Sequence, residues 1–172
     1  MISYRAPRRD EAAALALLGR ETFVETFGHL YRPEDLNAFL ASVYDPAALA
    51  EQIASDRYVF QLAEVDGRLV GYAKLGLDVS LDYDPGDQRV LELKQLYVFA
   101  DQHGAGVGQA LMDWTLAEAA ARQVDAILLS VWAENVRAHR FYARNGFRWV
   151  ADTYFMVGSH RDEEFLFLRP MS

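Results

Sequence analysis

Residues 96–112 read Leu-Tyr-Val-Phe-Ala-Asp-Gln-His-Gly-Ala-Gly-Val-Gly-Gln-Ala-Leu-Met. The pattern predicts a strand, a glycine-dense turn and then an amphipathic helix. Glycines at positions 104, 106 and 108 let backbone amides approach an anion without interference from Cβ atoms. The helix start adds unpaired N–H groups and the positive end of the helix dipole. This stretch therefore predicts a site for a phosphate-bearing cofactor.

Two common phosphate-binding motifs do not fit this stretch. No Lys-Ser or Lys-Thr pair follows Gly108, so it is not a Walker loop. Glycine at every second position also differs from the dinucleotide fingerprint, and the strand comes late in a meander. A tight turn without a ligand stays open as the alternative at this point.

The rest of the chain supplies alternating helical and strand patterns. After a first strand from Ile2, helices are expected over residues 11–27, from Pro33 and over 45–53. Strands follow over 58–65 and 68–77, joined by the hairpin turn Asp66-Gly67. A polar loop, 78–89, precedes a strand over 90–99. The remaining expected elements are helix 107–122, strand 126–131, helix 133–143 and strands 147–157 and 163–168. We predict one α/β domain over residues 1–172, with a mixed, largely antiparallel sheet flanked by helices.

A second informative stretch covers residues 134–147. Asn135 and Tyr142 are seven residues apart, about two helical turns, so the helical pattern places them on one face with the small Ala138 between them. Such a face can hold a narrow ligand arm with a polar group at each end. The alternative is that Tyr142 is a core aromatic residue.

Together the two stretches resemble the GNAT superfamily of N-acetyltransferases. Its patterns are Arg/Gln-x-x-Gly-x-Gly/Ala and Asn-x-x-Ala-x-x-Phe-Tyr-x-x-x-Gly-Phe. The second pattern is matched at every specified position, namely Asn135, Ala138, Phe141, Tyr142, Gly146 and Phe147. The first is matched at Gly106 and Gly108, whereas its leading position falls on His103. The resemblance extends from Asp66 to the C-terminus and, more loosely, to Ile2.

The resemblance implies a GNAT-like fold in which two strands splay apart and the pantetheine arm of acetyl-CoA inserts between them. Backbone groups of Leu96 and Val98, with Tyr97 between them, would hold that arm. The amides of His103, Gly104, Ala105, Gly106, Val107 and Gly108 would hold the pyrophosphate. Asn135 would contact the arm, and Tyr142 would lie near the thioester sulfur.

Acetyl transfer sets its own chemical requirements. A neutral amine attacks the thioester, a base takes its proton, and a backbone N–H, expected at Val98, stabilises the oxyanion. Tyr142 is the expected proton donor to the thiolate, and Glu92 is the expected base. Glu92 is predicted to share one strand face with Lys94 and Leu96. The alternative for Glu92 is an ion pair with Lys94. Because the chain has no cysteine, direct transfer in a ternary complex is favoured over an acyl-cysteine intermediate.

The acceptor amine is less well defined. Residues 21–31, with Pro33-Glu34-Asp35-Leu36, Val157-Gly158 and Arg161, are similar to the bacterial spermidine/spermine acetyltransferase branch. A polyamine acceptor would be bound by Glu21, Glu25, Tyr31 and Asp82, although solvated acids are the alternative for the carboxylates. A peptide N-terminus, an amino acid or an aminoglycoside-like amine also stays open as acceptor, as does a non-catalytic acyl-CoA-binding sensor.

Composition narrows the remaining classes of function and of partner. The net charge of −8 disfavours nucleic acid as a partner. No apolar run has the length of a membrane span or secretory signal, so we expect a soluble, cytoplasmic protein without a membrane partner. The absence of cysteine is consistent with that compartment, and His29, His139 and His160 show no metal-ligand spacing. The oligomeric state is left open, with a homodimer as the assembly considered.

Overall fold

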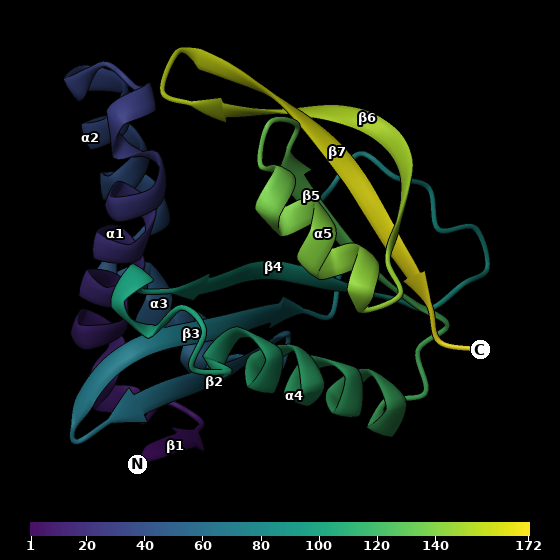
Figure 1. Ribbon diagram of the computed structural model, residues 1–172, viewed down its shortest axis with the longest axis horizontal. Coiled ribbons are helices and arrows are strands. Elements are labelled where there is room, and N and C mark those ends of the chain that lie inside the picture. Colours follow the sequence, from purple (N-terminus) through teal and green to yellow (C-terminus); the bar gives the residue numbers. More distant parts are fainter.

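A seven-stranded sheet forms the centre of the computed structural model, which describes residues 1–172 (Figure 1). The strand order is β1-β2-β3-β4-β5-β7-β6, and every neighbouring pair is antiparallel except β4 and β5. The strands are β1 (Ile2–Arg5), β2 (Tyr58–Val65), β3 (Arg68–Gly76), β4 (Val90–Val98), β5 (Ala126–Trp132), β6 (Arg148–Val157) and β7 (His160–Pro170). The predicted mixed, mostly antiparallel sheet is confirmed.

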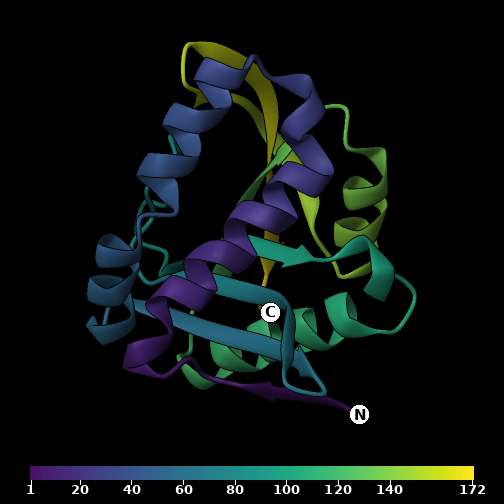
Figure 2. The same ribbon diagram turned by 90° about the vertical axis from the view of Figure 1, so that its left-hand side faces the viewer.

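Helices cover both faces of the sheet. The helices are α1 (Ala12–Phe27), α2 (Pro33–Val43), α3 (Pro46–Ala54), α4 (Val107–Ala121) and α5 (Val136–Arg144). Neighbouring strand residues point to opposite faces. Tyr72 packs with Leu15 and Phe23 of α1, whereas the next residue, Ala73, packs with Leu111 of α4. The N-terminal helices therefore lie on one face, which Figure 2 views from the α1 side, and α4 lies on the other.

The parallel strands β4 and β5 separate halfway along their length. Their pairing is limited to Val90 with Ala126, Leu91 with Ile127 and Glu92 with Leu128. Beyond these pairs, β4 runs on to Val98 and β5 to Trp132 without pairing to each other. This gap confirms the predicted splayed pair of strands.

A β-bulge in β4 changes which side chains share a face. Gln95 pairs with Lys74 and Leu93 pairs with Leu75, so Lys94 is the extra residue between them. As a result Leu93 and Leu96 pack into the same core cluster. Glu92 therefore lies on the face opposite to Leu96, and the prediction that these two residues share a face is wrong. Side chains along a regular strand alternate between the two faces of the sheet, and the extra residue at the bulge reverses that alternation.

Two predicted elements differ from the structure by more than one residue at an end. Helix α5 begins at Val136 and not at position 133, because Asn135 is its N-cap and its Oδ1 accepts the Ala138 N–H at 3.2 Å. Strand β7 extends from His160 to Pro170, well beyond the expected 163–168. It is longer because it pairs with β5 on one edge and with β6 on the other.

Candidate active site

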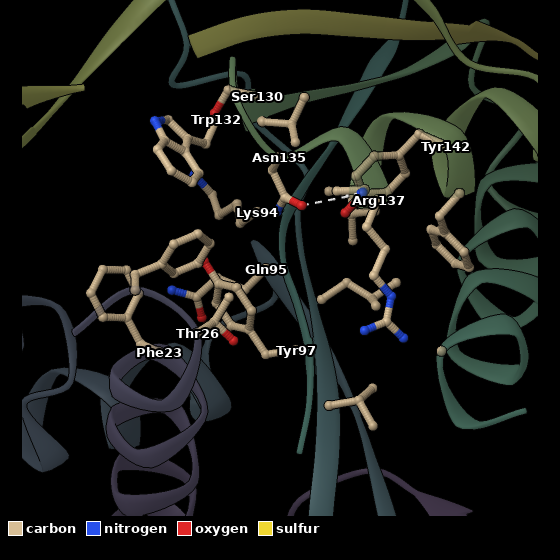
Figure 3. A pocket seen from close by; sticks show the side chains of 18 of the residues that line it. Phe23, Thr26, Lys94, Gln95, Tyr97, Ser130, Trp132, Asn135, Arg137 and Tyr142 are labelled. Carbon is tan, nitrogen blue, oxygen red and sulfur yellow. Dashed lines mark hydrogen bonds between the residues drawn. The ribbon is translucent and has the colours of Figure 1, made fainter. Parts of the chain in front are cut away.

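The gap between β4 and β5 opens into a cleft of about 1060 Å³ (Figure 3). The cleft is bordered by both strands, by α1 and α5, and by residues 103–108, which we call the glycine loop. Most of the residues predicted from the sequence line it, namely Tyr31, Glu92, Leu96, Tyr97, Val98, His103, Gly104, Gly106, Val107, Gly108, Asn135 and Tyr142. Residues far apart in the chain therefore meet at one site.

The glycine loop presents its backbone to open space. Gly104 and Gly106 have φ angles of +85° and +84°, a left-handed conformation that favours glycine. A Cβ atom added at either position would meet nothing within 4 Å. Gly106 is the N-cap of α4 without a side-chain cap, so the first N–H groups of this helix are free for a ligand.

Two of the predicted loop amides are already used inside the protein. The N–H groups of His103 and Ala105 donate to the carbonyls of Ala100 and Gln102, at 3.1 Å each. Ala105 also lies outside the cleft lining. The short 3₁₀ segment Ala100–Gln102 takes up these donors, so Gly104 and residues 106–108 form the part of the loop that faces the cleft.

Along the free edge of β4, every second residue directs its backbone N–H and carbonyl groups into the gap. Phe99 donates its N–H to the Val70 carbonyl at 2.9 Å, so the backbone groups of Phe99 are directed toward β3. The backbone groups of Tyr97, two residues earlier, are directed the same way. Those of Leu96 and Val98 are therefore directed into the gap. These are the two residues that the resemblance assigns to the pantetheine arm.

His103 connects three walls of the cleft. Its Nε2 lies 3.2 Å from the Val98 carbonyl, and its Nδ1 lies 2.6 Å from the Arg137 guanidinium. A carbonyl only accepts and a guanidinium only donates, so this geometry fits an imidazole whose Nε2–H donates to Val98 and whose Nδ1 accepts from Arg137. The residue that departs from the first family pattern thus ties β4 and the glycine loop to α5.

Tyr142 lies in the α5 wall of the cleft (Figure 3). Its ring packs edge-on against Phe147 and Phe167. Burial raises the pKa of its hydroxyl, so the phenol is protonated at neutral pH. Tyr142 therefore packs in the core and also lines the cleft, with a hydroxyl that is protonated at neutral pH.

Three arginines of α5 line the same side of the cleft. Arg137, Arg140 and Arg144 form no ion pair with a carboxylate. Their spacing places them near one another along the helix surface. The sequence analysis did not single them out, although this spacing was a usable signal in a chain of net charge −8.

Glu92 is held firmly by its neighbours. Its carboxylate accepts hydrogen bonds from the Ser80 N–H at 2.7 Å, from the Ser80 hydroxyl at 3.0 Å and from the Lys94 ammonium at 2.9 Å. Its side chain is only 4% exposed. The ion pair considered as the alternative for Glu92 is thus present, and the hydrogen bonds of Ser80 to Glu92 and Lys94 fasten the 78–89 loop to β4.

The opposite wall of the cleft carries a second pair of carboxyl groups, Asp162 and Glu164 of β7. The Tyr31 hydroxyl donates to Asp162 Oδ2, and His160 Nε2 lies 3.1 Å from its Oδ1. Glu164 is opposite Trp132 in the β5–β7 register and forms no ion pair. Burial raises the pKa of Glu164 to about 7; the charge of Asp162 adds to this rise, and Ser130 opposes it.

Aromatic rings complete this acidic wall. Phe27 meets Trp132 edge-on at 6.1 Å, and Phe23 meets Tyr97 at 6.5 Å between ring centroids. Aromatic faces attract cations, as carboxylates do. This end of the cleft therefore suits a positively charged group. Sequence reasoning identified Tyr31 there but missed Asp162 and Glu164.

Glu21, Glu25 and Asp82 are exposed, and none of them lines the cleft. The Glu25 carboxylate accepts the N–H of Ala100 and so caps the 3₁₀ segment. The structure therefore does not bring these three carboxylates together with Tyr31.

Buried Lys74 is a further cleft residue that sequence reasoning missed. Its ammonium lies 5.2 Å from the centre of the Tyr58 ring, and burial lowers its pKa to about 8.

Comparison with known proteins identifies the family. Residues 20–147 match the model of the acetyltransferase (GNAT) family. An uncharacterized N-acetyltransferase of Mycobacterium tuberculosis is 33% identical over 161 residues, covering 94% of this chain and 98% of that protein. The chain belongs to the GNAT acetyltransferase family, and it is an N-acetyltransferase.

Solved structures show the same fold. PaiA N-acetyltransferase from Thermoplasma acidophilum, solved in complex with coenzyme A, superposes with a TM-score of 0.81 at 20% identity and covers 99% of both chains. YncA from Salmonella typhimurium, solved with acetyl-CoA, has a TM-score of 0.73 at 19% identity, covering 99% of this chain and 94% of its own.

No group of three or more His, Asp or Glu side chains is arranged to hold a metal ion. None of the helices combines the length and the apolar character needed to cross a bilayer.

Proposed function

We propose that the cleft binds acetyl-CoA and transfers its acetyl group directly to the primary amine of a cationic acceptor. The observation that carries the proposal is the gap between β4 and β5, with the glycine loop on one side and an acidic, aromatic wall on the other. Relatives named N-acetyltransferases, and neighbours solved with coenzyme A or acetyl-CoA, support the choice of cosubstrate.

The cofactor half of the proposal rests on backbone groups. The pantetheine arm lies along β4 and bonds to Leu96 and Val98, with Asn135 at its side. The free amides of the glycine loop and α4 hold the pyrophosphate. Arg137, Arg140 and Arg144 supply positive charge near the phosphates.

The chemical half begins with attack of the neutral amine on the thioester carbonyl. The C–N bond forms, and the Val98 N–H stabilises the oxyanion. As the C–S bond breaks, Tyr142 gives its proton to the departing thiolate. A carboxyl group of the cleft takes the proton that the amine loses. Glu92 is the candidate predicted from the sequence, and Glu164 is the one that the structure adds.

A polyamine is the acceptor that we propose first. Asp162, Glu164 and the surrounding rings provide the negative and aromatic surface that a multiply charged amine requires. Tyr31 is placed to orient this surface through its bond to Asp162.

A thiol-release screen tests the function. Acetyl-CoA is incubated with spermidine, alanine, a peptide with a free N-terminal alanine, and tobramycin. Free CoA together with an acetylated amine supports the proposal, and the amine that reacts identifies the acceptor class. Binding of acetyl-CoA without thiol release from any amine would instead favour an acyl-CoA sensor.

A further inference from the structure

The cleft contains two glutamates on opposite walls, and their surroundings differ. Glu92 is bound by the Ser80 N–H, the Ser80 hydroxyl and the Lys94 ammonium. Protonating it would break an ion pair in a site that is almost closed to water. Both oxygens of the Glu92 carboxylate therefore already have partners inside the protein. Glu92 is therefore well suited to holding Ser80 and Lys94 in place.

Glu164 has none of these partners. It forms no ion pair, and the neighbouring exposed Glu163 is the residue that binds Arg161. In the β5–β7 register, Glu164 stands opposite Trp132, at the end of β5 that has separated from β4. Its carboxyl group lines the open part of the cleft, where no cation neutralises it.

The groups facing Glu164 come from four elements, and one of them is the Ser130 side chain of β5, whose hydrogen bond to Glu164 opposes the rise in its pKa. Asp162 lies two residues away on β7, Tyr31 belongs to the connection between α1 and α2, and Tyr97 belongs to β4. Asp162 is already engaged by Tyr31 and His160. None of these facing groups carries a positive charge, so Glu164 is the cleft carboxyl group left free to exchange a proton.

We infer that Glu164, and not Glu92, takes the proton from the acceptor amine. This inference rests on the proposed acetyl transfer. The amine nitrogen bonds to the acetyl carbon, and the resulting positively charged nitrogen gives one proton to the Glu164 carboxylate. The C–S electron pair stays with sulfur, which takes the Tyr142 proton. Release of the Glu164 proton to solvent and reprotonation of Tyr142 return the site to its starting state.

The electrostatics of the wall support this role. Burial and the charge of Asp162 raise the pKa of Glu164 to about 7, near the working pH of a cytosolic enzyme. A base is most effective when its pKa is near the operating pH. Burial in the cleft wall is the main cause of this rise in the pKa of Glu164.

The experiment compares pH profiles of kcat/KM for wild type, Glu164→Gln, Glu92→Gln and the control Glu163→Gln. The probe is the amine from the four-compound screen that the wild type acetylates fastest. Wild type should gain activity as the pH rises through about 7, where Glu164 ionises. Glu164→Gln should lose this step and fall roughly 10²- to 10⁴-fold in kcat. Glu92→Gln and Glu163→Gln should keep the step.

Two further measurements separate a chemical role from a structural one. Acetyl-CoA affinity, measured by calorimetry, should be unchanged in Glu164→Gln. Glu164→Asp, which retains a carboxyl group, should keep the step near neutral pH at a reduced rate.

A wild-type profile in Glu164→Gln, a change in KM alone, or loss of the step in Glu92→Gln would overturn the assignment. So would loss of the step in Glu164→Asp. Absence of thiol release by the wild type would contradict the proposed function itself, whereas turnover with an unchanged Glu164→Gln profile contradicts only this inference.

Discussion

The two sides of the cleft differ in charge and in the kind of group they present. The cofactor side offers backbone N–H groups at the start of α4 and three arginines of α5. The acceptor side offers Asp162, Glu164 and aromatic rings. One side therefore suits an anionic cofactor and the other a cationic amine. The comparison shows how a chain of net charge −8 can suit a polyanion at one place: the short helix α5 brings three arginines to the cofactor side of the cleft.

The largest effect is expected from removing the proton donor between the two sides. Tyr142→Phe should lower kcat roughly 10²- to 10⁴-fold, because the thiolate then leaves without a proton. The ring that packs on Phe147 and Phe167 is kept, so acetyl-CoA affinity should stay the same. Steady-state kinetics and calorimetry check the two halves of this prediction. Undiminished turnover would leave Tyr142 with a packing role only.

Ionisation of Glu164 on the acceptor side should also lower the stability of the fold. The pKa of Glu164 is raised in the folded state, from 4.5 to about 7, so its ionisation destabilises the fold as the pH rises through this window. Glu164→Gln should therefore raise the free energy of unfolding above pH 7 by up to roughly 3 kcal/mol, and the gain should vanish below the unfolded pKa. Urea unfolding at several pH values measures it.

Glu163→Gln serves as the matched control for this measurement, because its exposed side chain only meets Arg161. A pH-independent difference between Glu164→Gln and wild type would argue against a buried, titrating Glu164.

On the cofactor side, a single methyl group should be enough to disturb binding. Gly106→Ala places a Cβ at a φ of +84°, where a ligand anion is expected and no protein atom lies within 4 Å. Losing one hydrogen bond to a charged ligand costs about 1.5–3 kcal/mol, or roughly a 10- to 150-fold rise in the acetyl-CoA dissociation constant. Calorimetry measures this rise.

Gly67 offers a control for the strain alone. It has a similar φ of +83° and equally open surroundings, but it lies in the β2–β3 turn. Gly67→Ala should lower stability and leave acetyl-CoA affinity unchanged. Equal acetyl-CoA affinities of Gly106→Ala and Gly67→Ala would rule out the placement of the pyrophosphate at the glycine loop.

The smallest predicted effect concerns salt. Salt weakens the attraction between charges, much less for buried charges than for exposed ones. If Asp162 and Glu164 attract a multiply charged acceptor, added salt should raise the KM for spermidine more than the KM for a monoamine, by a few-fold at most. Kinetics at low and high salt test it. The same salt response for both amines would remove the electrostatic argument for a polyamine.

The cofactor side could be predicted from the sequence because its parts are local. The glycine loop and the segment from Asn135 to Phe147 are continuous stretches whose function depends on backbone geometry. Even there, two amides were assigned that the structure uses internally, those of His103 and Ala105. Short-range hydrogen bonds of a 3₁₀ segment are difficult to predict from composition.

The acceptor side could not be predicted in the same way. Asp162, Glu163 and Glu164 are consecutive acids, and only the pairing of β7 with β5 decides which of them enter the cleft. In β4, the bulge at Lys94 reverses the face on which Glu92 was placed. Strand register and bulges depend on distant partners, so a one-residue shift moves a side chain to the other face.

The central claim is that this cleft transfers an acetyl group from acetyl-CoA to an amine. The most direct measurement incubates the purified protein with acetyl-CoA labelled in its acetyl group and with spermidine, alanine, the alanine peptide or tobramycin, and then identifies products by mass spectrometry. We predict a labelled acetyl amide on one amine and an equal amount of free CoA, with both formed far more slowly by Tyr142→Phe. Bound acetyl-CoA that yields neither product with any amine would contradict the claim.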